Sequence, residues 1–308
     1  MHSDNSYHTN MHSLDIAVAK FKQSQLVKDT AMFDVELIPQ YALGLEVSKD
    51  AFRVSITDTQ ASRCLWLEEY HFSMLLQKEQ LIEQLAMVYE DHEFLQAGFW
   101  QKIRVSVKNQ YFTLLPSSLF YKDQALQYLK MASHTLPDSF EVLYYRHPHS
   151  EIVNVFAEDH SVTDWFRQNY PARNVEFVHY TSALIEGVFH TEPAPVRSVT
   201  VLVESSHLTI AVSNGRMLEY CNTFFYVSAQ DFIYYVMLAF HELQLNPEVH
   251  KVTLYGEISP ESAIFEQLYL YIRNVAFGHR PGTLKFSYLF DEVYDHRYFD
   301  VYNIHLCS

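Results

Sequence analysis

The sequence predicts an α/β fold built from two copies of one β-β-β-α-β-α unit and organised as two domains. Three observations predict it. Two meanders of alternating apolar residues occur, each is followed by a helix, a strand and a helix, and one register aligns both meanders without a gap. With 308 residues, 48% of them hydrophobic, the chain is long enough to bury the cores of two such units.

Residues 1–39 precede the first unit and are expected to form a polar tail followed by a short amphipathic helix. The helix is indicated by apolar residues at helical spacing, which are Leu14, Ala17, Val18 and Phe21. From Leu43 onward the apolar period changes to two, as expected for strands. Extended runs then predict a three-stranded meander over residues 43–47, 52–56 and 64–72.

The rest of the first domain is predicted from apolar spacing and turn residues. A helix over residues 78–90, a strand over 103–107 and a helix over 118–132 complete the first unit. Before the second unit we expect strands over 140–145 and 152–157, a helix over 162–170, a strand over 175–178 and a helix from Ser182. The stretch 192–195 contains proline and is the predicted boundary between domains at 40–195 and 196–308.

The second unit repeats the order of the first. Extended runs over 201–203, 208–212 and 217–226 predict a second meander, with Asn214 and Gly215 as a hairpin turn. Ser228 and Asp231 have the spacing of a capping box, which starts a helix. A strand over 252–255 follows, and Ser259 with Pro260 predicts the start of another helix that reaches about residue 272.

The register of the two meanders tests the repeat. At a constant offset of 156 residues, five apolar positions match: Leu45 with Val201, Val47 with Val203, Phe52 with Leu208, Val54 with Ile210, and Ile56 with Val212. A slip of one residue would turn a strand's core face outward, so this ungapped match favours duplication. The later strands, at residues 102–105 and 251–254, align at an offset of 149, which predicts shorter connections in the second unit.

Composition narrows the functional classes. The formal net charge of -15, without a basic stripe, argues against nucleic-acid binding. The three cysteines, Cys64, Cys221 and Cys307, are far apart and form no CxxC pair, which fits a reducing compartment. No apolar run approaches the length of a membrane span and no signal peptide is visible, so we expect no membrane association and a cytoplasmic location.

The repeated order of elements resembles the actin, hexokinase and Hsp70 superfamily, actin-like ATPases whose RNase H-like domains clamp ATP and a divalent metal between them. Two stretches carry a closer resemblance: residues 112–120, and residues 231–235 leading to the strand end at 254–256. They resemble an uncharacterised Bacteroidetes family known only as domain of unknown function 3822. The resemblance covers about Tyr41 to the C-terminus and implies the actin-like fold without a known activity.

The superfamily comparison locates a nucleotide cleft at three turns. Active members carry Asp-x-Gly at the first hairpin of each meander, where the glycine lets backbone amides approach phosphate. The corresponding residues here are Ser48, Lys49 and Asp50 in the first unit and Glu204, Ser205 and Ser206 in the second. Neither turn has a glycine. A third turn, which contacts adenosine in active members, corresponds to Gly256 and Glu257.

These departures predict a degenerate cleft with no catalytic residues and no cofactor. If the cleft is functional, the ligands expected there are ATP and Mg²⁺. The 17 histidines are scattered, and His147 with His149 lacks a zinc-site pattern, so no metal site is predicted. The leading hypothesis is a non-enzymatic scaffold with a protein partner. The alternatives are an ATP- and metal-dependent enzyme that uses Asp50 or Glu204, and a small-molecule sensor that uses the interdomain cleft.

Overall fold

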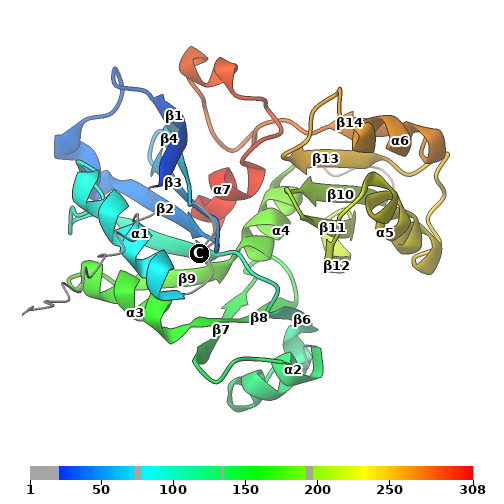
Figure 1. The fold of residues 1–308 in the computed structure, drawn as a ribbon, viewed down its shortest axis with the longest axis horizontal. Helices are drawn as coiled ribbons and strands as arrows, with labels where there is room; N and C mark the ends of the chain where they lie inside the picture. Colours follow the sequence, from blue (N-terminus) through cyan, green and yellow to red (C-terminus); the bar gives the residue numbers. More distant parts are fainter. Residues whose placement is uncertain (1–20, 73–77, 133–134, 192–196, 308) are drawn as a thin grey trace, which may run out of the picture.

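The structure is a computed structural model that describes residues 21–72, 78–132, 135–191 and 197–307. Two mixed sheets, of six and five strands, are joined by the connecting helix α4 (Tyr180–His190) (Figure 1). A third sheet, of three strands, lies beside the first. The predicted α/β fold with two duplicated units is therefore confirmed.

The six-stranded sheet has the order β1-β4-β3-β2-β5-β9. Its predicted strands are β2 (Tyr41–Val47), β3 (Ala51–Asp58), β4 (Arg63–His71), β5 (Lys102–Val107) and β9 (Val175–His179). The meander is antiparallel, whereas β5 pairs parallel with both β2 and β9. Helices α1 (Lys78–Asp91) and α3 (His160–Asn169) place apolar residues in the same core as alternate residues of the meander.

The N-terminal segment contains a strand that the sequence pattern did not predict. Strand β1 (Lys22–Lys28) pairs antiparallel with β4 at the edge of the sheet, and a 3₁₀ turn, η1 (Val35–Gln40), leads into β2. Of the seven residues of β1 only Val27 is buried, so the strand shows little apolar alternation. Its conformation therefore depends on pairing with β4. Leu14, Ala17 and Val18 of the predicted helix lie outside the described residues.

The predicted helix over 118–132 is wrong in both extent and place. Residues 117–119 and 122–124 form 3₁₀ turns, and helix α2 begins only at Ala125 (Ala125–Ala132). It packs on the small sheet formed by β6 (Phe112–Pro116), β8 (Ile152–Asp159) and β7 (Phe140–Arg146). The buried Leu129 packs there rather than against the first meander. The small sheet is therefore an insertion, and α3 is the second helix of the first unit.

The five-stranded sheet repeats the pattern in the order β12-β11-β10-β13-β14. Its elements are β10 (Ser198–Val203), β11 (His207–Asn214), β12 (Met217–Phe225), α5 (Ala229–Glu242), β13 (Val252–Gly256), α6 (Ala263–Tyr271) and β14 (Val275–Phe277). The predicted capping box of Ser228 and Asp231 is present at the start of α5. Helix α6, however, starts later than predicted, because Ser262 rather than Ser259 caps it by accepting the Phe265 N–H.

The hydrogen-bonded registers confirm the predicted repeat. Leu45 pairs with Val54 in the first unit, and Val201 pairs with Ile210 in the second, which preserves the offset of 156 residues between the units. Leu45 also pairs with Val105, and Val201 with Leu254, which preserves the offset of 149. The register shift after Ile56 recurs after Val212, so even an irregularity of the meander is duplicated.

The C-terminal segment returns to the first sheet. It contains η4 (Tyr288–Glu292), α7 (Phe299–Asn303) and η5 (Ile304–Leu306). Helix α7 contacts α4, β2 and β3, and Val301, Tyr302 and Ile304 belong to the core of the first unit (Figure 1). The domain boundaries at residues 39 and 195 stay predictions. Among the described residues, no helix combines the length and the apolar character that crossing a membrane requires.

Candidate functional site

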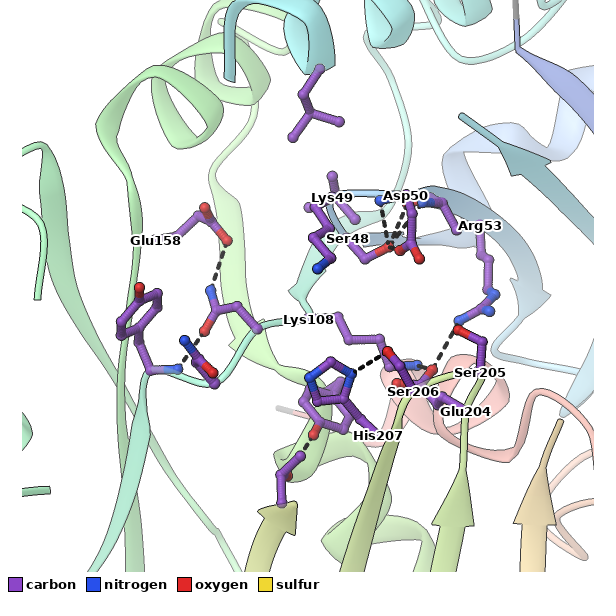
Figure 2. Close-up of a pocket in the computed structure, with 18 of the residues that line it drawn as sticks. Ser48, Lys49, Asp50, Arg53, Lys108, Glu158, Glu204, Ser205, Ser206 and His207 are labelled. Atoms are coloured by element: carbon purple, nitrogen blue, oxygen red, sulfur yellow. Dashed lines mark hydrogen bonds and ion pairs between the residues drawn. The ribbon is translucent and has the colours of Figure 1, made fainter. Parts of the chain in front are cut away.

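A cavity of about 510 Å³ lies between the two units. The β2–β3 turn lines one side and the β10–β11 turn lines the other (Figure 2). All six residues predicted at these turns line it: Ser48, Lys49, Asp50, Glu204, Ser205 and Ser206. Glu257 also lines it, whereas Gly256 borders a neighbouring space of only about 10 Å³. The structure thus brings both turns to one open cleft, while a role in nucleotide binding stays a prediction.

The first turn satisfies its own backbone amides. Ser48 Oγ accepts the N–H of Ala51 at 2.9 Å and that of Asp50 at 3.4 Å. The same hydroxyl donates to Asp50 Oδ1 at 2.8 Å. In a glycine-rich phosphate loop such amides are free to bind phosphate. Here the serine side chain occupies them.

The second turn is held by a backbone pair and a side-chain contact. The Glu204 N–H donates to the His207 carbonyl at 2.9 Å, and Ser206 Oγ lies 2.9 Å from His207 Nδ1. Burial lowers the pKa of His207 from its usual value, which keeps the imidazole neutral at neutral pH. This turn therefore presents hydroxyls and a neutral ring to the cavity, with Glu204 as its charged group.

The third turn is covered by the chain itself. Gly256 has φ of +91°, and a Cβ atom there would lie 2.1 Å from the Val203 carbonyl oxygen, so glycine is required. Its N–H donates to the His296 carbonyl at 2.9 Å, and His296 Nε2 lies 2.7 Å from the Ile258 carbonyl. The C-terminal segment is thereby tied to the turn, which explains the small remaining space.

A ladder of charged residues crosses the first meander on the face that meets α7. Arg53 is the cross-strand neighbour of Glu46 on one side and of Glu69 on the other, and it contacts each carboxylate at 2.6 Å. At the corresponding positions of the second meander, Thr209 and Thr223 bond to the Tyr180 hydroxyl at 2.8 and 2.7 Å. The two units therefore share a register but differ in polarity at the cleft.

Arg53 and Lys108 connect the first unit to the second. Arg53 contacts Glu257 at 3.1 Å and Glu204 at 3.7 Å. Lys108, at the end of β5, contacts Glu204 at 2.6 Å, Asp300 of α7 at 2.7 Å and Glu46 at 3.0 Å. Both cationic side chains are less than a tenth exposed. These contacts bind the first sheet, the second sheet and the C-terminal helix into one charged network.

The network holds more carboxylates than cations. Arg53 and Lys108 face five acids: Glu46, Glu69, Glu204, Glu257 and Asp300. Burial, followed by the charge of Asp300, raises the pKa of Glu46 to about 7. Burial also opposes ionisation of Asp300, but Lys108 and Arg53 outweigh it and lower its pKa. Glu46 Oε2 is buried without a partner among the described residues, so a proton on Glu46 relieves the excess of negative charge.

A further carboxyl group stands at the other end of the cavity. Glu158 lies near the end of β8 in the small sheet and accepts hydrogen bonds from the Asp159 N–H at 2.8 Å and from Asn109 Nδ2 at 3.0 Å. Burial raises its pKa to about 7. His147, considered above as a metal ligand, instead binds Glu186 at 2.7 Å in a separate buried pair. The described residues hold no group of three or more His, Cys, Asp or Glu side chains that could bind a metal ion.

Sequence reasoning found the turns but missed the network. One signal was available, because pairing Val47 with Phe52 across the first turn also pairs Glu46 with Arg53. Lys108 gave a weaker signal as the first residue after a buried strand. Asp300 gave none, since its partner lies 192 residues away in the sequence.

Comparison with protein families assigns the chain to one family. The sequence model of a family described as "Protein of unknown function (DUF3822)" matches residues 29–275. The chain belongs to the DUF3822 family. This matches the resemblance seen in the sequence. No curated protein sequence matches this DUF3822 chain.

Solved structures show the fold of this DUF3822 protein to be that of actin-like ATPases. A Bacteroides thetaiotaomicron protein described as having an actin-like ATPase fold and unknown function is 21% identical, with a TM-score of 0.76 over 90% of this chain and 100% of that one. A PilM–PilN type IV pilus biogenesis complex matches at 13% identity, with a TM-score of 0.54 over 86% of this chain and 97% of that one. At these identities the likeness concerns the fold alone.

Proposed function

We propose that this DUF3822 protein is a non-hydrolytic actin-like scaffold that associates with another protein. The observation that carries the proposal is the bond from the Gly256 N–H to the His296 carbonyl. In active members of the superfamily, the corresponding turn contacts adenosine. Here the Gly256 N–H is already bonded to the His296 carbonyl, and the space beside this turn measures only about 10 Å³, far less than an adenosine requires.

The charges of the cleft support the same proposal. The carboxylates of Glu204 and Glu257 are more exposed than Arg53 and Lys108 and already pair with them, so these two cations are not free to receive a triphosphate. The amides of Asp50 and Ala51 are already bonded to Ser48 Oγ. The residues present therefore do not fit Mg²⁺-ATP in the way of the active superfamily members.

An association role rests on fold and composition. The PilM–PilN structure, one of the fold matches, is a complex between two proteins, which offers a precedent for this architecture as a partner-binding module. The net charge of -15 favours protein rather than nucleic acid as the partner. A cytoplasmic location belongs to the same proposal.

Isothermal titration with Mg²⁺ and ATP tests the nucleotide part. We expect no binding heat up to millimolar ATP, with an ATP-binding actin-like protein measured in parallel as a positive control. Binding in the micromolar range would contradict the proposal. Affinity purification of the tagged chain tests the association part, and we expect one specific protein to be retained in stoichiometric amount after a high-salt wash.

The open cavity favours a second candidate function, a small-molecule sensor. A volume of about 510 Å³ lies within the usual range of ligand pockets. Thermal-shift screening distinguishes this candidate from a pure scaffold, because a ligand that binds the folded state raises its midpoint. The enzymatic alternative requires metal-dependent ATP turnover that falls in Glu204→Ala, and absence of turnover in the wild-type protein removes it.

A further inference from the structure

The inner wall of the cavity consists of carboxylates with free oxygens. The ion pairs of Glu204 and Glu257 all use Oε1, and no described residue bonds to Oε2 of either side chain. These side chains are 21% and 29% exposed, whereas Arg53 and Lys108 behind them are 8% and 7% exposed. A ligand therefore meets these two carboxylates before it reaches Arg53 or Lys108, whereas Lys49 lies exposed at the mouth of the cavity.

The network still holds more carboxylates than cations when Glu46 carries a proton. Glu69, Glu204, Glu257 and Asp300 then face three cations, because Arg297 joins Arg53 and Lys108 through its 4.0 Å contact with Glu69. Glu158 adds a carboxyl group at the opposite end of the cavity. In a partly buried site an unbalanced charge is costly, and a ligand of opposite charge that balances it gains the corresponding free energy.

The remaining wall of the cavity is largely apolar. Its apolar surface comes from the first meander, α1, the insertion and α3, namely Val47, Leu81, Tyr111, Phe140 and Val162, and polar residues such as Asn109 and Gln110 lie between them. Leu81 lines the cavity from α1, as does Lys49 from the β2–β3 turn. An apolar ligand body placed there removes hydrocarbon surface from water, at about 25 cal/mol per Å².

We propose that this cavity binds an organic cation, an ammonium or guanidinium group carried on an apolar body. The cationic group lies against Oε2 of Glu204 and Glu257, and the apolar body packs toward Leu81 and Val162. Such a ligand is either a free amine or the Lys or Arg side chain of a partner segment that also carries a bulky apolar residue. The inference rests on the proposed function, because it requires a cleft that holds no nucleotide.

Matched probes test the charge preference. Phenethylammonium, phenethyl alcohol and hydrocinnamate share one apolar body and differ in charge, so their affinities for the full chain are compared by isothermal titration. We expect the cation to bind at least tenfold more tightly than the alcohol, and the anion most weakly. A second series compares the peptide acetyl-Phe-Arg-Leu-amide with the same peptide carrying Gln in place of Arg. If phenethylammonium binds more tightly than the Arg peptide, the natural ligand is a free amine, and if the peptide binds more tightly, it is a side chain of a partner segment. Equal affinities across both series would overturn the inference.

Two variants locate the contact. Glu257→Gln is expected to weaken the cationic probes about tenfold, as for loss of a charged hydrogen bond, without changing the affinity of the alcohol. Glu261→Gln is the matched control, because Glu261 is exposed on the same connection but does not line the cavity. Leu81→Ala should weaken all three phenethyl probes alike. An unchanged cation affinity in Glu257→Gln would refute the proposed position of the cation.

The outcomes separate this inference from the proposed function. Micromolar binding of Mg²⁺-ATP would contradict the scaffold proposal whatever the amines do. Failure of every cationic probe, together with no ATP binding, would remove the organic-cation site alone.

Discussion

Lys108 Nζ and Asp300 Oδ2 lie 2.7 Å apart, although 192 residues separate them in the sequence. Lys108 follows the strand beside the first meander, and Asp300 lies on the C-terminal helix. Both side chains are nearly inaccessible to solvent, so each charge is stabilised by the opposite charge of the other. The contact attaches the C-terminal helix to the cleft.

Lys108→Met should destabilise the fold by about 3–5 kcal/mol, because it leaves Asp300, Glu204 and Glu46 around a missing cation. Urea unfolding followed by circular dichroism measures the change. Lys49→Met serves as the control, since Lys49 is exposed at the mouth of the cavity and should change stability by less than about 0.5 kcal/mol. Equal changes in the free energy of unfolding for the two variants would show that the charged network contributes nothing to stability.

Glu46 should make stability depend on pH. The unfolded group titrates near 4.5 and the folded one at about 7, so the folded state keeps a proton that the unfolded state has lost. This contribution to stability therefore decreases as the pH rises through that window. Glu69 does not interfere, because Arg53 overcomes the effect of burial and lowers its pKa to about 2.

Glu46→Gln keeps the group neutral and tests this slope. Between about pH 5 and pH 8, the stability of the variant relative to wild type should rise by roughly 1–3 kcal/mol. Urea unfolding of both proteins at each pH gives the difference directly. A difference that stays constant across the window would mean that Glu46 is ionised throughout.

Gly256→Ala should cost at least about 2 kcal/mol, because its φ is +91° and the new Cβ would collide with the Val203 carbonyl. Gly282→Ala is the matched control, since nothing lies within 4 Å of its Cβ position. Thermal unfolding compares the two. If Gly256→Ala unfolds at the wild-type temperature, the turn has another conformation than the one described.

Gly187→Ala should loosen the C-terminal helix. A Cβ on Gly187 of α4 would lie 2.2 Å from Asn303 Nδ2 and 2.7 Å from Phe299 Cε1, so α7 must shift to accept it. Hydrogen exchange of amides 299–307 should become faster, while that of α5 stays unchanged. Gly98→Ala, where nothing lies within 4 Å, should leave both rates as in wild type.

The sequence predicted what depends on local pattern. Alternation located both meanders, and their offsets of 156 and 149 residues recur in the hydrogen-bonded registers. The local pattern failed for residues 22–28, which become a strand only because β4 offers an edge. It also failed for residues 118–124, where an apolar run forms 3₁₀ turns over an inserted sheet. The turns of the candidate site were predictable from register, whereas the contact of Lys108 with Asp300 was not, because no spacing rule relates residues so distant in the chain.

The return of the C-terminal segment sets the order in which the molecule can be completed during synthesis. Val301, Tyr302 and Ile304 belong to the core of a sheet whose strands end at His179. While the ribosome makes the second unit, the first sheet is already outside but lacks these side chains. The face of the sheet that meets α7 stays uncovered until the second unit has emerged, so folding of the first unit finishes last although it is made first.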